Sequence, residues 1–392
     1  MKSSFLEGLK KNAMAVILVL VFLFFAATTK GQMFQPLQFN ALITQNAYVY
    51  ILASGMLICM LTGGNIDLSA GSFVCFVGVI GGKLMVNMGV STPVALLAML
   101  AVGVVYGCIL GYVIAYVNVP PWIATLAGYL ALRGWGIALM EGASNISPLP
   151  KEFTGLFSGK VPDIFPEIFD KFNLTCMIVG IIVAAVFIFL QIKDRNTKLK
   201  KGYEVEKQGM LIARCAIVAA VILLFAFKLS QSGGIPFMLI WVAAVVLVYS
   251  FITSKTDVGR YFYTMGGNTE ATRLSGVDTK LMMFLAYLNM CIMSVVAAWL
   301  TMSRFQAANS TAGTNYEMDA IAACVVGGVS AYGGSGSVFG MIIGATLIGV
   351  INLGMSLMGI DANWQKVVKG AVLLGAVVFE IVSNRKKAAA NK

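Results

Sequence analysis

The chain has 392 residues, of which 59% are apolar and only 11% are charged. About a quarter of the residues in a soluble domain are charged, so this composition excludes a soluble enzyme. The mean hydropathy of +0.85 and repeated apolar runs of about 20 residues predict an all-α polytopic membrane protein. We therefore expect the net charge of +11 to lie in loops that set the orientation, and we expect no nucleic-acid partner.

Cysteine and histidine usage argues against a metal or catalytic site. The seven cysteines lie within or at the edges of apolar runs, and the chain has no CxxC and no histidine. A disulfide framework or a metal site is therefore not expected, and the commonest general base is missing. We expect a non-catalytic chain without a metal or a cofactor. The basic start precedes an apolar run but lacks a good cleavage site, which favours an uncleaved first helix.

Apolar runs separated by polar breaks predict about twelve membrane spans. Cationic residues cluster in residues 1–12, 193–207, 255–280 and 385–392. Twelve crossings from an inside N-terminus place all four clusters, and both termini, on the cytoplasmic side. The acidic connection 141–172 then lies outside. The predicted spans are 13–29, 43–62, 70–89, 93–117, 121–140, 173–192, 211–228, 234–253, 281–303, 318–331, 336–358 and 364–383, of which the tenth is short.

No loop exceeds about 32 residues, too short to build a core of its own, so residues 1–392 form a single transmembrane domain. Gly-rich breaks recur in both halves, at residues 63–72 and 327–337. Paired interruptions of this kind indicate a transporter's pathway. The predicted topology places both breaks on the same side, so they do not by themselves establish an inverted repeat.

Six ionisable residues lie in apolar stretches, where each is costly unless it is paired, hydrated or near an interface. Snorkelling explains two of the lysines, and helix capping is the simplest interpretation of Asp67 and Asp319. Paired intramembrane charges, which are typical of ion coupling, are not recognised in the sequence. The six residues are Asp67, Lys83, Arg133, Asp319, Lys366 and Lys369.

The alternative interpretation of the breaks is a path for a polar solute. A sugar that moves without its hydration shell needs hydroxyl, amide and carboxylate partners where apolar helices are interrupted. The candidate pathway residues are Asn65, Asp67, Ser69, Asp319 and Ser330.

Residues 258–277 are the most specific segment of the chain. They predict a loop, a Gly266-Gly267 turn, and a short amphipathic helix with Asn268 as its N-cap. The apolar side chains of that helix favour docking on a cytoplasmic partner. A nucleotide site is not expected, because the nearest phosphate-loop candidate, residues 155–161, has the wrong spacing and lacks Ser or Thr after its lysine.

Four stretches of this sequence resemble the permease subunits of monosaccharide ABC importers, the group for ribose, xylose, galactose and multiple sugars. They are residues 64–72 (GNIDLSAGS), 121–134, 266–276 and 312–328, and residues 364–370 give a weaker fifth match. Together they span residues 43–383 in the family's order. The stretch 173–230, two extra spans around a basic loop, is absent from the shorter ribose-type members and resembles the xylose and multiple-monosaccharide branch.

The resemblance implies a ten-helix core of paired half-repeats plus two extra helices, in the bacterial cytoplasmic membrane. It also implies a homodimer with the pathway at its two-fold axis, a separate cytoplasmic ATP-binding subunit, and an extracytoplasmic sugar-binding protein. The segment 254–280 would then couple the chain to the ATPase. The expected coupling residues are Gly266, Gly267, Asn268, Glu270, Arg273 and Leu274.

On this resemblance, the chain is expected to pass a pentose or hexose in an ATP-driven importer. Import of another small polar solute, such as a nucleoside, a signalling furanone or a branched-chain amino acid, stays open, because the binding protein does most of the selecting. An ion-coupled secondary transporter is disfavoured by the missing paired charges. A membrane enzyme is less favoured still.

Overall fold

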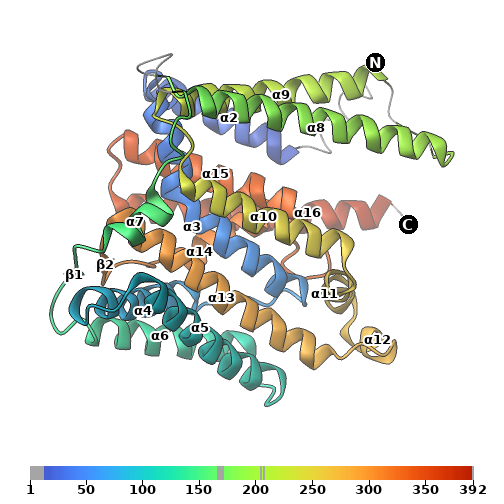
Figure 1. Cartoon of the computed structure of the whole chain (residues 1–392). Coiled ribbons are helices and arrows are strands. Elements are labelled where there is room, and N and C mark those ends of the chain that lie inside the picture. The colour runs from blue at the N-terminus through green and yellow to red at the C-terminus, as the bar shows by residue number, and fades with distance from the viewer. Residues whose placement is uncertain (1–12, 166–171, 204, 206–207, 391–392) are drawn as a thin grey trace.

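The computed structural model describes residues 13–165, 172–203, 205 and 208–390, and its helices run side by side in stacked layers (Figure 1). The basic segment 1–12 lies outside the described residues. The helices are α2 (Ala13–Thr28), η1 (Gln32–Phe34), α3 (Pro36–Leu61), α4 (Ala70–Gly82), η2 (Lys83–Asn87), α5 (Thr92–Ala115), α6 (Pro121–Ala138), α7 (Lys151–Ser158), α8 (Leu174–Lys200), α9 (Gln208–Gln231), α10 (Phe237–Lys255), α11 (Asp257–Gly267), α12 (Thr269–Leu274), α13 (Thr279–Phe305), α14 (Tyr316–Val326), α15 (Val338–Leu357) and α16 (Ala362–Ala390). Two short strands, β1 (Asn145–Ile146) and β2 (Ala308–Asn309), pair antiparallel.

Each predicted span coincides with a helix, which confirms an all-α polytopic membrane protein. Eight helices of the described part are long and apolar enough to cross a membrane: α3, α4 with η2, α5, α8, α9, α10, α13 and α15. The predicted tenth span is wrong in length, because α14 has 11 residues and ends at Val326. At 1.5 Å per residue it extends about 17 Å, roughly half the hydrocarbon thickness.

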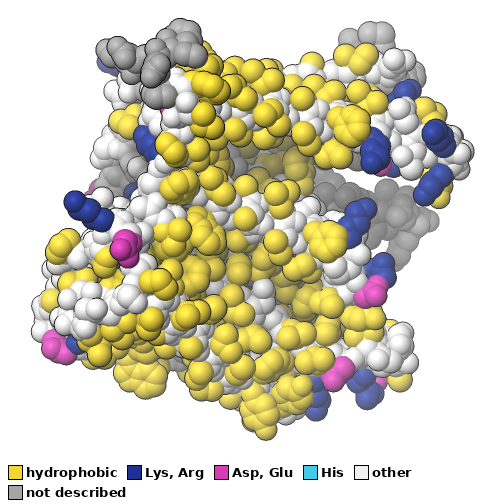
Figure 2. Space-filling model, viewed as in Figure 1, with side chains coloured by type: hydrophobic (Ala, Val, Ile, Leu, Met, Phe, Trp, Pro, Cys, Tyr) yellow, Lys and Arg dark blue, Asp and Glu magenta, His cyan; other side chains and the backbone are white. Residues whose placement is uncertain are grey.

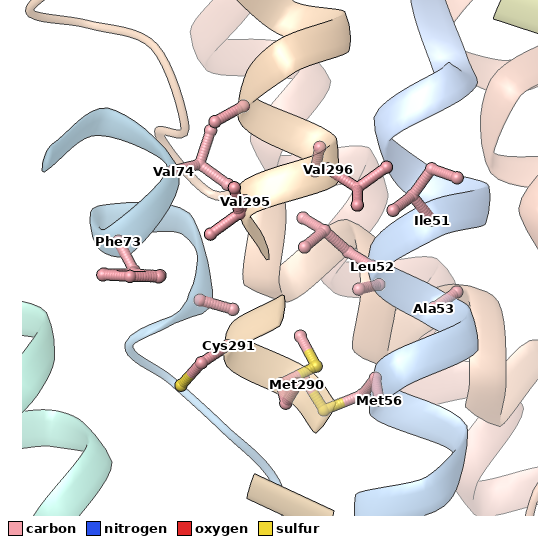
Figure 3. Close-up of a cluster of buried hydrophobic side chains, with 14 of the residues drawn as sticks. Ile51, Leu52, Ala53, Met56, Phe73, Val74, Met290, Cys291, Val295 and Val296 are labelled. Atoms are coloured by element: carbon pink, nitrogen blue, oxygen red, sulfur yellow. The ribbon is translucent and has the colours of Figure 1, made fainter. Parts of the chain in front are cut away.

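The centre of the molecule is an apolar core between α3, α4 and α13 (Figure 3). Leu52 and Met56 from α3 meet Phe73 from α4 and Met290 and Val295 from α13, and all five side chains are buried. Helices inside a bilayer gain little from apolar contact alone, because lipid is equally apolar. Close packing, rather than exclusion of water, therefore stabilises this core.

Small residues allow these helices to approach one another closely. A Cβ added at Gly103, Gly107 or Gly111 of α5 would lie within 2.9 Å of an atom of α13. A Cβ added at Gly344 of α15 would lie 2.0 Å from the carbonyl oxygen of Ala323 in α14. Both glycine rows therefore face a neighbouring helix backbone.

The helices form two halves, and the first long helix of each half packs against the first three helices of the other half. α3 packs against α13, α14 and α15, while α13 packs against α3, α4 and α5. Likewise, α4 contacts α6, and α14 contacts α16. In this contact pattern α3 to α6 correspond to α13 to α16, which agrees with the core of paired half-repeats that the resemblance implies. Outside this core, α8 and α9 form a hairpin that packs mainly on itself and on α3.

Candidate functional site

α11 begins a two-helix unit at the end of the molecule opposite β1 and β2 (Figure 1). Thr256 caps α11 through its hydroxyl oxygen, which accepts a hydrogen bond from the Gly259 amide at 3.1 Å. Phe262 and Met265, three residues apart, are buried on one face. The predicted loop and Gly-Gly turn are therefore wrong, because the helix continues to Gly267. A capped start and a buried apolar face outweigh the low helix propensity of two glycines.

Gly266 lies where α11 meets both Gly-rich breaks. A Cβ at this position would come within 2.1 Å of the Leu61 carbonyl oxygen and of the Gly334 amide nitrogen. Gly334 also donates a backbone hydrogen bond to Leu61 at 3.1 Å. The Tyr263 hydroxyl donates to the Gly336 carbonyl oxygen at 3.0 Å. α11 therefore contacts both the end of α3 and residues 327–337.

α12 starts and ends as the sequence predicts. The Asn268 carboxamide oxygen accepts a hydrogen bond from the Ala271 amide at 2.9 Å, which confirms Asn268 as the N-cap. Gly276, with φ of +88°, follows the end of the helix. This left-handed conformation suits glycine and stops the helix after two turns.

The outer face of α12 carries an ion pair and an exposed leucine. Arg273 donates two hydrogen bonds to the Glu270 carboxylate, from Nη2 at 2.6 Å and from Nε at 3.0 Å. These hydrogen bonds and the Arg273 charge lower the pKa of Glu270 below its ordinary value. Leu274 is 76% exposed. This face is available to a partner, and its role in binding an ATPase stays a prediction.

At the first break, residues 62–69 join α3 to α4, and the last three residues of the predicted break 63–72 already belong to α4. Asp67 is 1% exposed, and its Oδ1 accepts hydrogen bonds from the Ser69 amide at 2.8 Å and the Ser69 hydroxyl at 2.6 Å. Its Oδ2 accepts none from the described residues. Asn65 donates to the Thr62 hydroxyl oxygen at 3.1 Å. Asp67 thus stabilises the start of α4, although Ser69 occupies the N-cap position itself.

The start of α14 approaches the start of α4 from the other half of the chain. Glu317, 1% exposed, places Oε2 2.0 Å from the position that a Cβ on Gly71 would occupy. That oxygen also has no hydrogen-bond partner among the described residues. Arg133 of α6 fixes the preceding loop by donating to the Ala312 carbonyl oxygen at 2.9 Å. Two interrupted helices therefore meet at their N-terminal ends, each with a buried carboxylate.

Glu317 is the functional candidate that the sequence interpretation missed, although a sequence signal exists. The two interrupted segments share the pattern Asn-x-acid-x-polar-Ala, and two later helices share Trp-x5-Gly. The corresponding positions are Asn65 and Asn315, Asp67 and Glu317, Ser69 and Asp319, Trp122 and Trp364, and Gly128 and Gly370.

The counterpart of the first break is therefore residues 306–315, rather than the Gly-rich residues 327–337. Residues 62–69 follow α3 at the α11 end, whereas residues 306–315 follow α13 at the β1–β2 end. Segments that enter from opposite ends are what an inverted repeat requires. The similarity of the two Gly-rich breaks had obscured this relation.

Asp319 does not cap α14, because it lies one turn inside the helix and Asn315 occupies the N-cap position. Its carboxylate instead pairs with Lys369 of α16 at 2.8 Å and accepts a hydrogen bond from the Tyr48 hydroxyl at 2.6 Å. The expectation that paired intramembrane charges are missing is therefore wrong. The two partners are 50 residues apart in the chain, so only the fold brings them together.

The remaining predicted residues separate into different surroundings. Ser330 is buried in a turn, where its hydroxyl oxygen accepts a hydrogen bond from the Tyr332 amide at 3.2 Å. Lys83 pairs with Glu141, and Lys366 is exposed on α16, so snorkelling stays a prediction for both lysines. The five candidate pathway residues therefore do not form one cluster. Three lie in the first break, Ser330 lies in the turn against it, and Asp319 lies on α14.

Comparison with known proteins places this arrangement in a family. Residues 38–377 match the family model described as branched-chain amino acid transport system / permease component. The chain is 33% identical over 380 residues to the xylose transport system permease protein XylH of Haemophilus influenzae, covering 97% of this chain and 98% of that protein. It is 29% identical over 374 residues to the ribose import permease protein RbsC of Escherichia coli K12, covering 95% and 94%. No solved structure gives a significant match.

Proposed function

We propose, from the premise that this chain belongs to the family of branched-chain amino acid transport system permease components, that it is the transmembrane subunit of an ATP-driven monosaccharide importer. The observation that carries the proposal is the junction at Gly266, where a docked two-helix unit contacts the end of α3 and residues 327–337 together. An energy-supplying subunit bound at this end would move both segments at once. The xylose permease relative supports a pentose such as xylose as the substrate.

The partners follow from the two ends of the molecule. A separate ATP-binding subunit would dock on the exposed face of α12 and hydrolyse ATP. A sugar-binding protein would deliver the solute at the opposite end, near β1, β2 and α7. We expect two copies of this chain in the bacterial cytoplasmic membrane, with both termini and the α11–α12 end in the cytoplasm.

The solute path is proposed to run past the facing starts of α4 and α14. Sugar hydroxyls donate hydrogen bonds, and the carboxylates of Asp67 and Glu317 each have one oxygen without a partner among the described residues. Asn65 and Ser69 lie in the same break. Because both carboxylates are buried, the segments must separate before a solute reaches them. The Asp319–Lys369 pair is outside this path and holds α14 to α16.

Uptake tests the substrate. Cells that express the chain with its neighbouring ATP-binding and sugar-binding genes are expected to accumulate labelled xylose in an ATP-dependent manner, with unlabelled pentoses competing. A branched-chain amino acid should not compete. Uptake of leucine in place of sugars would assign the chain to the other solute class named in the family description. Uptake driven by an ion gradient without ATP would contradict the importer.

Adjacent glycines test the coupling end. Gly266→Ala is expected to reduce sugar-stimulated ATP hydrolysis strongly, because its Cβ would meet two backbone atoms at 2.1 Å. Gly267→Ala is the matched control, since a Cβ there meets nothing within 4 Å. Arg273→Glu places two acids on the outer face and should detach the ATP-binding subunit while the chain still inserts. Normal ATP hydrolysis and co-purification in both Gly266→Ala and Arg273→Glu would remove α11 and α12 from coupling.

Single cysteines test the orientation in a background without the native cysteines. Lys151 lies at the start of α7 and Lys200 at the end of α8, and both are exposed. An impermeant thiol reagent applied to intact cells is expected to label Lys151→Cys and to leave Lys200→Cys unlabelled. The reverse pattern would invert the proposed orientation.

A further inference from the structure

The α8–α9 hairpin is fastened to the core near the β1–β2 end. There Ile43 of α3 packs against Cys176 and Leu229 in a small buried cluster, and the rings of Phe39 and Phe225 meet edge to face at 4.9 Å. Elsewhere the hairpin packs sparsely. In an apolar stretch of 18 residues within each helix, only 22% of the residues of α8 and 17% of those of α9 are buried, against 78% for α3. The hairpin therefore leaves space between itself and the core.

This space is an apolar groove of about 410 Å³ between the hairpin and the faces of α3, α10 and α15, and we term it the hairpin groove. Figure 2 shows a hollow lined by hydrophobic side chains beneath the α8–α9 layer. Its few polar atoms include the hydroxyls of Tyr50 and Thr346, which hydrogen-bond to each other at 2.9 Å. The volume is that of a ligand site, and the lining suits a hydrocarbon rather than a sugar.

The cationic end of the hairpin lies in line with the groove. On α8 the lining residues Val179 and Val183 are four positions apart and share one face of the helix. Ile222 lines the groove from α9. Steps of four residues continue the same faces from Val183 to Gln191 on α8 and from Ile222 to Arg214 on α9. There Arg214 Nη2 donates a hydrogen bond to Gln191 Oε1 at 2.8 Å. Residues 193–214 carry seven cations and three acids. A hydrocarbon chain in the groove would therefore have its polar end beside an excess of positive charge.

We propose that the hairpin groove binds an acyl chain of an anionic phospholipid, with its phosphate beside Arg214 and the neighbouring cations. The apolar walls select a hydrocarbon, and the basic end selects a negative headgroup from the membrane leaflet at that end. A second copy of this chain fits less well, because it would bring an identical cationic loop against this one. The site is independent of the proposed transport function and stabilises the hairpin against the core.

A photoactivatable phosphatidylglycerol, with a diazirine in its acyl chain, tests the site. The full chain is reconstituted in phosphatidylethanolamine vesicles that contain this probe, and labelled peptides are mapped by mass spectrometry. We expect labelling to concentrate on the groove faces of α8, α9 and α10. Ala243→Trp, which fills the groove from α10, should remove most of it. Val248→Trp, on the same helix but 54% exposed and outside the groove, is the matched control and should leave labelling unchanged.

Headgroup selectivity is tested with the same probe built on phosphatidylcholine. Phosphatidylglycerol is expected to label the groove several-fold more strongly, and Arg214→Gln should abolish that preference. Arg195→Gln on α8 repeats the test if loss of the Arg214 bond disturbs the hairpin, and Lys280→Gln at α13 is the distant control. Equal labelling by both lipids would overturn the proposal, as would labelling spread evenly over all lipid-facing helices. Spontaneous disulfide formation between Val183→Cys and Ala243→Cys would show that protein closes the groove, and would also overturn it.

Discussion

The two interrupted segments share a sequence pattern but are held in different ways. In the first, Asp67 bonds to Ser69 within the break itself. In the second, Asp319 occupies the position that corresponds to Ser69 and forms an ion pair with Lys369 of a neighbouring helix. The position in α6 that corresponds to Lys369 is Ala127, five residues after the shared tryptophan. The first half therefore relies on hydrogen bonds within the break itself, whereas an ion pair joins the second half to α16.

Removing Lys369 should have the largest effect on this difference. The Asp319 side chain is 3% exposed, so Lys369→Ala leaves a buried carboxylate without its countercharge. Loss of one partner from a buried pair typically costs about 3–5 kcal/mol. We expect a large drop in the thermal unfolding temperature of the purified chain in detergent.

The double variant Asp319→Ser with Lys369→Ala gives the second half the residues that the first half has at the corresponding positions, Ser69 and Ala127. It removes both charges together, so most of the lost stability should return. Lys366→Ala, an exposed lysine one turn away on the same helix, is the control. A double variant as unstable as Lys369→Ala alone would show that the charges are not what distinguishes the halves.

Enlarging Gly71 tests the contact between the halves. A Cβ there would lie 2.0 Å from Glu317 Oε2 and 2.3 Å from the Gly313 carbonyl oxygen. Overpacking of this kind costs about 1–3 kcal/mol, so Gly71→Ala should lower the unfolding temperature and uptake together. Gly134→Ala, with nothing within 4 Å of the new Cβ, should do neither. Equal behaviour of the two variants would mean that the starts of α4 and α14 are not in contact.

Asp67→Asn separates capping from transport in the first half. The amide retains an oxygen to accept the Ser69 hydrogen bonds, so the cost in stability should stay below about 1 kcal/mol. If Asp67 also contacts the solute, uptake should fall while the basal ATP hydrolysis of the complex persists. Uptake at the original rate in both Asp67→Asn and Asp67→Ala would remove this carboxylate from the path.

Asp163 provides a smaller effect outside both halves. The Thr175 hydroxyl and the amides of Phe165, Thr175 and Leu174 donate to its carboxylate and lower its pKa below the ordinary value of 3.8. Because the folded pKa is the lower one, the stabilisation of the α8 start is present above pH 3.8 and lost as pH falls through the folded value.

Hydrogen exchange at Leu174 and Thr175 measures this effect. Protection factors should fall on acidification in the original chain. In Asp163→Asn they should be low at every pH, because the carboxylate is gone. A pH dependence that is the same in both chains would assign the change to another group.

The sequence predicted what depends on local pattern. Each of the twelve apolar runs coincides with a helix of the described part, and Asn268 and Gly276 marked the ends of α12, because spans and caps depend on neighbouring residues. The length of the short helix α14 was overestimated. The apolar run continues past Val326, but the helix ends before Gly328, which has a φ of +83°. Two glycines likewise suggested a turn where α11 continues, because the buried contacts of Phe262 and Met265 are not visible locally.

The candidate site was predicted less completely, because its contacts join distant parts of the chain. Asp67 and Ser69 are two residues apart, so a local role for Asp67 at the start of α4 was evident from the sequence, although Ser69 occupies the N-cap position. Glu317 was missed because its place beside Gly71 depends on the contact between α14 and α4, which belong to different halves. The Asp319–Lys369 pair was missed for the same reason. Spacing along the chain cannot show which helices lie side by side.

The backbone hydrogen bond from Gly334 to Leu61 joins the two halves beside α11, and linkage gives it a measurable consequence. If ATP-binding subunits shift α11 and thereby change the affinity of the path for sugar, the sugar must change the affinity of α12 for those subunits by the same factor. Sugar-loaded binding protein should then alter the dissociation constant of the ATP-binding subunit without touching it. In Gly266→Ala, both affinity changes should be lost together.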